Sequence, residues 1–229
     1  MIHIFCSPED EAAVWLAEEL RERGSSVTVS LPEELVINSR LSLEIGNDFL
    51  RPSVILASGI TITPEKSTAI IIRMTQFPLP ALTGASDNDL VYASEEVRAT
   101  LVGWFSAWKC MTIGRPDPYT PWGDGASEDE WRIMAMNSNI SIASQNGEKN
   151  RAFDLLVTSS EVYASDEREL EPATVDAARI LFTLQSDAVA AFRFRQEAKG
   201  AAFERLIPMP DFRIFGSFLP NMLAAEATI

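Results

Sequence analysis

The sequence predicts an α/β fold with a parallel-sheet N-terminal domain and a small α+β C-terminal lobe. Three observations lead to this prediction: a strand–helix–strand pattern at the start, a fully apolar run in the first half, and a hairpin pattern near the end. The chain has 229 residues, of which 46% are hydrophobic. This composition supplies a sizeable core without help from disulfides or metals.

The opening of the chain reads as strand, helix and strand. Ile2 to Phe5 is a short apolar run, and Ser7 stands where a helix N-cap is expected, with Pro8 as the first helical residue. Apolar residues then recur at helical spacing until Gly24. Val27 to Leu31 is rich in β-branched residues and predicts the second strand. Such a unit winds right-handed into a parallel sheet.

Two apolar runs and a long helix follow. The runs are Val54 to Ala57 and Ala69 to Ile72, and the second lacks polar alternation, as expected for a strand covered on both faces. Asp89 to Lys109 predicts a helix, and Met111 to Ile113 predicts another short strand. These elements extend the parallel sheet of the N-terminal domain.

The second half of the chain begins with a helix and a polar linker. Ser127 and Glu130 have the spacing of a capping box, and Ile140 to Ala143 is a weak strand candidate. The polar residues 145–150 predict a hinge. We therefore expect domains at residues 1–144 and 150–229.

The C-terminal lobe is predicted as strands, a helix, a hairpin and a final helix. One or two strands are expected between Phe153 and Tyr163, and Pro172 opens a helix. Val189 to Arg195 and Ala201 to Ile207 read as a β-hairpin, and a helix covers Phe218 to Ala225.

The charge of the chain excludes several classes of partner. Nineteen Lys and Arg stand against 33 Asp and Glu, which gives a formal net charge of -14. Nucleic-acid binding needs clustered cations, and an anionic membrane surface would repel this chain. No apolar run approaches the ~18 residues of a membrane span, and the first residues are too short for a signal peptide. We expect a cytoplasmic protein with neither nucleic-acid nor membrane partners.

Cysteine and histidine offer little chemistry. Cys6 precedes a helix, whose dipole could lower its pKa, but His3 would point to the opposite face of a strand. A buried thiol is the favoured interpretation for Cys6. With Cys110, the chain holds two cysteines and one histidine, too few for a zinc site. Phosphate-loop and dinucleotide motifs are absent as well, so we expect no metal and no cofactor.

Two arginines are candidates for ligand binding. Arg73 follows a fully apolar strand, and Arg115 follows the strand at Met111 to Ile113. Ligands bind at the carboxyl edge of parallel strands, where two guanidinium groups could hold a carboxylate or phosphate. The alternative, equally open, is that these arginines pair with local acids such as Glu95 or Glu96.

The segment from Ala69 to Pro116 resembles the N-terminal domain of ATP-grasp ligases. An apolar strand ends in Arg73, a helix begins with Asp89-Leu-Val-Tyr92 and Glu95, and Ile113-Gly-Arg-Pro116 follows. In this family a strand also ends in Arg, a Tyr and a Glu begin a long helix, and an Asn-Arg-Pro turn follows, where this chain has Gly114. The similarity is to the pre-ATP-grasp domain of the peptide-modifying group, and it implies Arg73, Glu95 and Arg115 as ligand-binding candidates.

The C-terminal lobe resembles the end of the same fold, with its metal ligands changed. Leu206 to Gly216 is similar to the segment after the strand that carries Glu-x-Asn in active ligases, where these residues hold Mg²⁺. The resemblance places Arg205 and Ile207 at those two positions. Glu204 is one residue out of register, and on a strand it would point to the opposite face.

A second departure from the family is larger. Active relatives insert a subdomain with phosphate-contacting lysines and a glycine-rich lid, whereas here only Gln145 to Arg151 joins the two regions. The acid expected on the preceding strand is missing from Ala190 to Phe194. Phosphoryl transfer depends on the electrostatic clamp that these groups supply. The resemblance therefore implies a degenerate relative without the nucleotide-clamping subdomain.

These observations favour a non-catalytic binding or accessory protein. It would act with a biosynthetic peptide or amino-acid ligase, and a protein or peptide would be its partner. One alternative is a ligase-type enzyme that a partner chain completes or that uses altered chemistry. Another is a homo-oligomeric structural module, and a homodimer stays open.

Overall fold

The computed structural model divides the protein into two compact units. It describes residues 1–37, 39–79, 83–123, 125–144, 152–166, 168–185, 187–198 and 200–226. Unit 1 comprises Met1–Gly123 and the chain from Pro220, and unit 2 comprises Asp124–Leu219. The predicted hinge at residues 145–150 lies outside the described residues. The predicted domain bounds, 1–144 and 150–229, rest on that polar stretch and stay a prediction.

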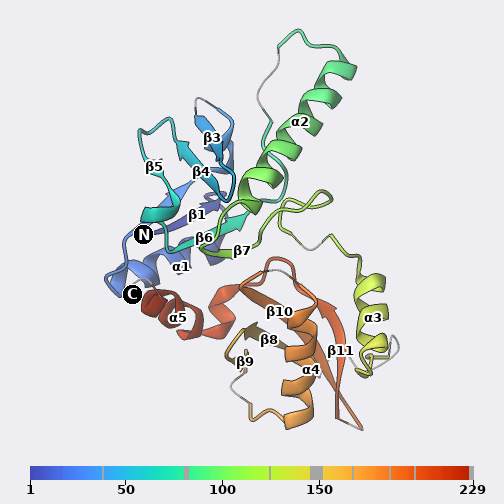
Figure 1. Cartoon of the computed structure of the whole chain (residues 1–229). Helices are drawn as coiled ribbons and strands as arrows, with labels where there is room; N and C mark the ends of the chain where they lie inside the picture. The colour runs from blue at the N-terminus through green and yellow to red at the C-terminus, as the bar shows by residue number, and fades with distance from the viewer. Residues whose placement is uncertain are drawn as a thin grey trace. The chain divides into compact units, whose positions relative to one another are not determined.

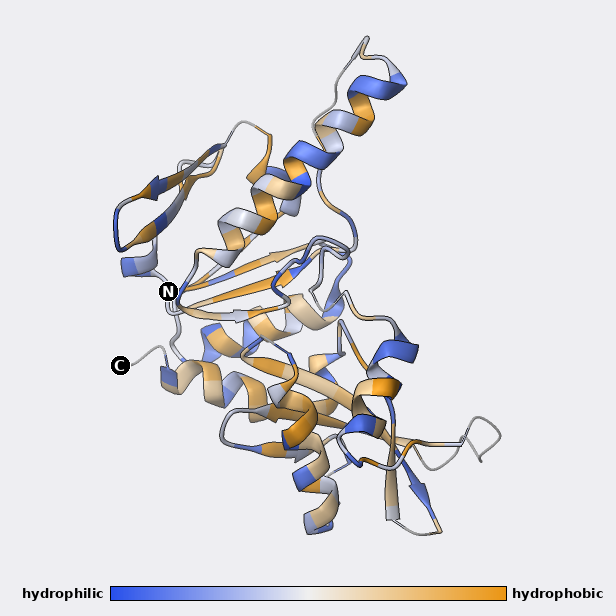
Figure 2. Cartoon of the chain, turned by 45° about the vertical axis from the view of Figure 1, so that its right-hand side comes forward, coloured by the Kyte–Doolittle hydropathy of each residue, from blue (hydrophilic) through white to orange (hydrophobic). Residues whose placement is uncertain are grey.

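A parallel sheet forms the centre of unit 1 and confirms the α/β prediction (Figure 1). Its order is β2-β1-β6-β7, and every neighbouring pair is parallel. The strands are β1 (Ile2–Cys6), β2 (Val27–Ser30), β6 (Ala69–Arg73) and β7 (Met111–Ile113). All five residues of β1 and of β6 are buried. Figure 2 shows the central strands of this sheet largely in the hydrophobic colour.

Helix α1 (Glu11–Glu22) connects β1 and β2, but it begins later than predicted. Asp10, rather than Ser7, is the N-cap, and its side chain accepts a hydrogen bond from the Ala13 amide at 3.1 Å. The Ser7 carbonyl accepts the Asp10 amide at 3.1 Å in the turn before the helix. The prediction of Ser7 as the cap was wrong. Serine and aspartate can both cap a helix, so the local sequence did not decide between them; the ion pair of Asp10 with Arg73 holds Asp10 at the start of α1.

Helix α2 (Asp87–Ser106) covers the sheet with its C-terminal half. Its Leu101, Trp104 and Phe105 are buried, and they share a hydrophobic core with residues of β1 and β6. The N-terminal half of α2 extends away from the parallel sheet (Figure 1). Ser86 caps the helix in a capping box with Asp89.

A small antiparallel sheet in unit 1 was not predicted. Its order is β3-β4-β5, with β3 (Arg40–Ile45), β4 (Leu50–Ile55) and β5 (Thr61–Ile62). The apolar run beginning at Val54 belongs to the end of β4. The indole N–H of Trp104 on α2 donates to the carbonyls of Ser42 at 3.1 Å and Ser53 at 3.2 Å, which ties the sheet to the helix. Short 3₁₀ helices, η1 (Pro32–Leu35) and η2 (Pro64–Lys66), flank this sheet.

Unit 2 is an antiparallel sheet with helices α3 (Glu128–Asn137) and α4 (Pro172–Thr183). The sheet has the order β11-β10-β8-β9. Its strands are β8 (Ala152–Thr158), β9 (Val162–Ala164), β10 (Val189–Glu197) and β11 (Gly200–Leu206). The structure thus confirms the predicted hairpin, the helix opening at Pro172 and the capping box at Ser127. The candidate strand at Ile140 to Ala143 is reduced to one isolated bridge, between Ile142 and Phe203.

Aromatic side chains fill the core of unit 2 on one face of its sheet. The Trp131 ring of α3 lies 5.8 Å from Phe192 and 6.4 Å from Phe203, centroid to centroid. After β11 come η4 (Phe212–Phe215) and α5 (Phe218–Glu226), and α5 begins in unit 2 and ends in unit 1. No helix in the described part of the chain is both long and apolar enough to span a membrane.

Candidate functional site

The carboxyl edge of the parallel sheet holds Arg73 at the end of β6. Its side chain is 7% exposed and forms an ion pair with Asp10, with Nε 2.6 Å from Oδ2. The Arg73 Nη2 also donates to Oδ1 of the same carboxylate, at 3.2 Å. The two-point geometry is that of a strong guanidinium–carboxylate pair. The partner is neither Glu95 nor Glu96, and it lies on the N-terminal side of α1.

Cys6 stands opposite Arg73 in the β1–β6 register. Burial raises its pKa to about 11, and the nearby charge of Asp10 adds to this effect. At neutral pH the group is therefore a protonated thiol, which is a poor nucleophile. The structure confirms the interpretation of Cys6 as a buried, free thiol.

Arg115 lies two residues after the end of β7, the strand that neighbours β6 in the sheet. Ile71 pairs with Ile113, so the two strands bring Arg73 and Arg115 to the same edge. The Arg115 Nη2 donates to the carbonyl of Trp108 at 3.4 Å. Gly114, between the strand and this arginine, has a φ of +72°.

Glu95, the third candidate, lies away from the sheet edge in the N-terminal half of α2. It is exposed and pairs with Arg98 one turn along the helix. Whether Arg73, Glu95 and Arg115 bind a ligand stays a prediction. In the structure, Arg73 pairs with Asp10 and Glu95 pairs with Arg98 on its own helix.

A row of charged side chains crosses one face of the sheet in unit 2. Arg193 on β10 donates to both oxygens of Asp154 on β8, at 2.6 and 2.8 Å. Arg195 on β10 lies 3.0 Å from Glu204 on β11. Bonding to the Asp154 carboxylate raises the pKa of Arg193 above its usual value. The two carboxylates of this row are therefore neutralised within the protein.

Arg205 stands directly opposite Arg193 in the β10–β11 register. A β-bulge separates this pair from the next one, so Glu204, between Phe203 and Arg205, is not paired with any residue in the β10–β11 register. Paired residues of antiparallel strands share a face of the sheet, so the row contains three arginines and two acids. Its net charge is positive, which disfavours a divalent cation.

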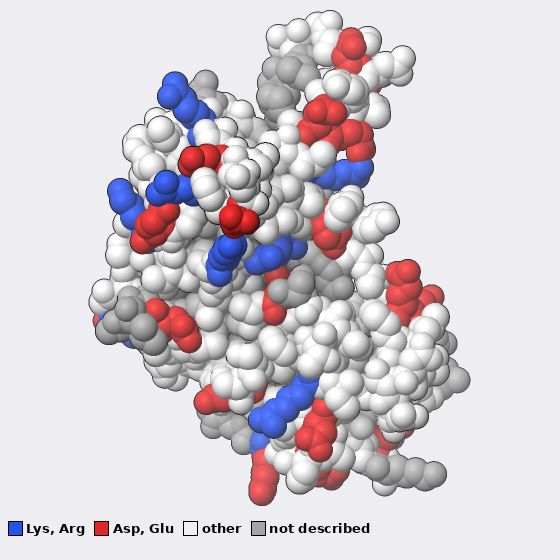
Figure 3. Space-filling view, in the orientation of Figure 1, with Lys and Arg blue, Asp and Glu red and all other residues white. Residues whose placement is uncertain are grey.

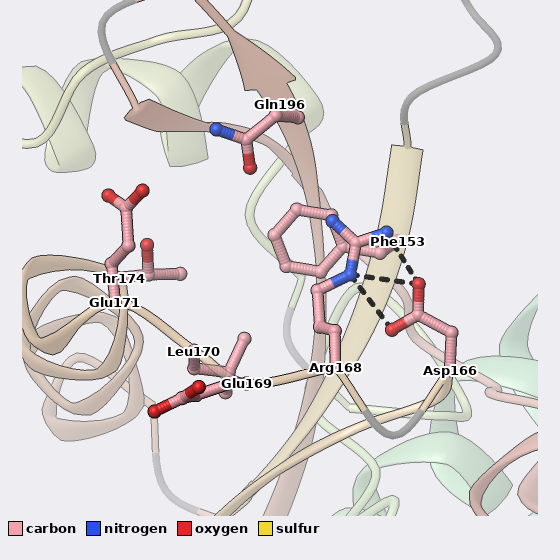
Figure 4. Close-up of a pocket in the computed structure, with 8 residues that line it drawn as sticks. All are labelled: Phe153, Asp166, Arg168, Glu169, Leu170, Glu171, Thr174 and Gln196. Atoms are coloured by element: carbon pink, nitrogen blue, oxygen red, sulfur yellow. Dashed lines mark hydrogen bonds and ion pairs between the residues drawn. The ribbon is translucent and has the colours of Figure 1, made fainter.

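A pocket of about 300 Å³ lies at one end of this sheet (Figure 4). Arg168 donates through Nε to both oxygens of Asp166, at 2.9 and 2.8 Å, and its guanidinium lies 4.0 Å from the centre of the Phe153 ring. Hydrogen bonding to Arg168 lowers the pKa of Asp166. Glu171, before α4, and Gln196, on β10, reach into the same space (Figure 4).

The charge of this pocket determines what it can accept. Glu169 and Glu171 line it in addition to Asp166, and among the described lining residues Arg168 is the one cation. A phosphate or carboxylate would meet a surplus of negative charge there. The pocket suits an amine, a guanidinium or a neutral hydrogen-bonding group. Among the described residues, no group of three or more His, Cys, Asp or Glu is arranged to hold a metal ion.

The sequence did not indicate the pocket, and of the charged row it singled out only Glu204 and Arg205. Asp154 and Arg193 are 39 residues apart, and no local motif marks them as partners. The pocket gathers residues from β8, β10 and the loop before α4. A signal for the sheet face was present in part, because Arg193 and Arg195 alternate with Phe192 and Phe194 on one strand of the hairpin.

The fold is that of the ATP-grasp ligases. This likeness comes from structure alone, since no protein-family model and no curated protein matches the sequence.

Three solved structures show the likeness at the level of individual proteins. The first is a RiPP-associated ATP-grasp ligase of Chryseobacterium gregarium in complex with ADP and a leader and core peptide; it has a TM-score of 0.69, 11% identity and coverage of 99% of this chain and 94% of that one. The second is the macrocyclase MdnC of Microcystis aeruginosa MRC bound to its precursor peptide MdnA, with a TM-score of 0.73, 8% identity and coverage of 99% and 98%. The third is the ATP-grasp ligase PsnB with precursor peptide PsnA2 and AMPPNP, with a TM-score of 0.62, 13% identity and coverage of 99% and 97%.

Proposed function

We propose that this chain is a degenerate relative of the peptide-modifying ATP-grasp ligases that binds a peptide or protein and does not catalyse phosphoryl transfer. It would act as an accessory protein beside a complete biosynthetic ligase. The fold likeness supports the relationship, and the named neighbours in complex with precursor peptides support a peptide as the ligand class.

The charged face of the unit 2 sheet carries this proposal. The positions that the resemblance assigns to the metal ligands hold Arg205 and Ile207, and Arg205 faces a second guanidinium, Arg193. The acids of the same face, Asp154 and Glu204, are already paired with arginines. Mg²⁺ would have to displace these pairs, and the triphosphate would lose the cation that compensates its charge during transfer.

Calorimetric titration with ATP and Mg²⁺ tests the proposal. We expect no binding heat at millimolar nucleotide and no shift in melting temperature. A complete peptide-modifying ATP-grasp ligase, titrated in the same buffer, is the positive control. Magnesium-dependent binding by this chain would overturn the proposal.

One observation favours a second function, a ligase that a partner chain completes. The three solved structures described above are ATP-grasp ligases or a macrocyclase, and the chain covers 94% or more of each of them. This reading requires the isolated chain, or the chain mixed with its partner, to hydrolyse ATP when a peptide is added. A coupled ADP-release assay on both samples distinguishes the two functions.

A further inference from the structure

An apolar groove in unit 1 lies between α2 and the segment formed by η1 and β3. It has a volume of about 290 Å³. The buried side chains of Leu35 and Leu101 contribute to its lining. Val97 of α2 and Leu41 of β3 are partly buried and line it as well. This volume is at the lower end of the range for small-molecule sites, so the groove suits one or two anchoring side chains of a larger ligand.

The apolar wall on β3 continues beyond the groove. Side chains two residues apart share a face of a strand, so Leu43 and Ile45 extend the row that starts at Leu41. Leu43 is 38% exposed and Ile45 is 73% exposed. Leu50 of β4 pairs with Ile45 and is also exposed. The hairpin therefore presents an apolar strip leading away from the core.

The wall on α2 continues in the same manner. Residues three or four positions apart lie on one face of a helix, so the row of Leu101 and Val97 continues to Leu90. The neighbouring row runs from Thr100 through Glu96 to Tyr92, whose side chain is 67% exposed. The face of α2 that is buried in its C-terminal half is thus uncovered in its N-terminal half.

Acidic residues predominate on the α2 side of this apolar surface, whereas the hairpin side carries Arg40 and Arg51, and Arg51 is paired with Glu44 and Glu65. Between residues 87 and 100, α2 carries Asp87, Asp89, Glu95 and Glu96 against one cation, Arg98. Figure 3 shows acidic side chains along this part of the helix. The carboxylate of Glu96 lines the groove itself. A second copy of this chain, with its net charge of -14, would bring like charges together on such a surface.

We propose that this groove binds a basic amphipathic peptide segment, whose apolar side chains enter between α2 and β3 and whose Lys or Arg pairs with Glu96. The proposal rests on the proposed function for its ligand class, a peptide, and adds the site and the charge of that peptide. Apolar anchors at helical spacing flanked by cations are a common form of segment bound in a groove.

Fluorescence polarisation with two labelled synthetic peptides tests the site. The probe is an amphipathic Leu/Lys peptide of about 14 residues, or four helical turns. The comparison peptide has the same length and pattern, with Glu in place of every Lys. We expect the basic peptide to bind and the acidic peptide to bind at least about tenfold more weakly. Equal binding of both peptides, or no binding of the basic one, would overturn the proposal.

Two variants locate the binding, each with a matched control on α1. Glu96→Lys should weaken the basic peptide about tenfold, whereas Glu18→Lys makes the same charge change on an exposed residue elsewhere. Val97→Thr keeps shape and charge but places a hydroxyl in the groove, and we expect about fivefold weaker binding. Val14→Thr is its control. Equal effects of variant and control would mean non-specific attraction to an acidic protein and would refute the site.

Sedimentation of the free protein tests whether a second copy of this chain occupies the groove instead of a peptide. A dimer that Val97→Thr dissociates would show that a second copy covers the groove, and it would overturn the peptide proposal. These tests do not depend on nucleotide. Magnesium-dependent ATP binding would contradict the proposed function, whereas only the peptide-binding and sedimentation results can contradict peptide binding in the groove.

Discussion

Asp10 serves two structural roles with one carboxylate. It caps α1 through the Ala13 amide and neutralises the buried guanidinium of Arg73. We expect Asp10→Asn to keep an acceptor for the cap but to remove the carboxylate charge that faces the buried guanidinium of Arg73. The free energy of unfolding should fall by about 3 kcal/mol, the cost of breaking a buried ion pair from one side.

Urea denaturation measures this change. Glu18→Gln, which removes a carboxylate from an exposed position of α1, is the control and should alter stability little. If Asp10→Asn costs no more than this control, the Asp10–Arg73 pair contributes nothing, and Arg73 becomes a stronger candidate for ligand binding.

His3 makes the stability of unit 1 dependent on pH. It is 1% exposed, neither ring nitrogen has a hydrogen-bond partner among the described residues, and burial lowers its pKa to about 4. In the unfolded chain its pKa is ~6.5. Between these values the unfolded state binds the proton, so stability is greatest above pH 6.5 and is lost as the pH falls towards 4.

We expect His3 to remove about 3 kcal/mol over this range, because each unit of pKa difference corresponds to ~1.4 kcal/mol. The measurement is urea unfolding of the wild type and of His3→Leu at a series of pH values. Acidic residues titrate in both proteins, so the difference between the two curves isolates the histidine. A difference that does not change with pH would contradict the prediction.

At the scale of single elements, two glycines lead to opposite predictions. Gly114 ends β7 with a φ of +72°, and a Cβ there would lie 2.2 Å from the carbonyl oxygen of Ile72. Gly103 lies within α2, and a Cβ there would have no neighbour within 4 Å. Gly114→Ala should destabilise by at least about 2 kcal/mol, through backbone strain and overlap. Gly103→Ala should stabilise by up to ~1 kcal/mol.

Thermal and urea unfolding of the two variants check this prediction, and each serves as the other's control for adding one methyl group. If Gly114→Ala were as stable as the wild type, the turn after β7 would have to adopt another conformation. Arg115 would then occupy a different place at the sheet edge.

The elements that the sequence predicted well are those with strong local patterns. The apolar run of β6, the helical spacing in α1 and the capping box of α3 depend on neighbouring residues, and all three occur in the structure. The small antiparallel sheet was missed although Leu41, Leu43 and Ile45 alternate with polar residues. That alternation is a usable signal for β3, but it is weaker than the continuous apolar runs that mark the parallel strands.

The pairing of charges could not be predicted in the same way. Asp10 and Arg73 are 63 residues apart, and Asp154 and Arg193 are 39 apart. The sequence placed Arg73 and Arg115 correctly at a common strand edge, because parallel topology requires it. Their partners depend on which side chains the tertiary fold brings close, and no local pattern encodes this information.

At the scale of the whole molecule, α5 contributes to unit 1 from a distant part of the chain. Leu223 is 1% exposed, and Arg23 donates to Asn221 at 2.8 Å, which ties α5 to the end of α1. We expect Leu223→Ala to reduce the free energy of unfolding by about 2–5 kcal/mol. Met222→Ala, at a partly exposed neighbouring position, should cost less and is the control.

Tryptophan fluorescence can assign this loss to unit 1. Of the five tryptophans, only Trp131 lies in unit 2. In a Trp131→Phe background the remaining four report on unit 1 alone. An unchanged urea midpoint for Leu223→Ala in that background would show that α5 does not stabilise unit 1.

The division of unit 1 into two chain segments also affects the order in which the protein can form during translation. The strands β1, β2, β6 and β7 leave the ribosome before any residue of unit 2, yet the chain from Pro220 that completes their unit is made after all of it. Unit 2 is one continuous segment and can fold as soon as it emerges. The N-terminal part of unit 1 must therefore wait for its last helix until the rest of the chain has been synthesised.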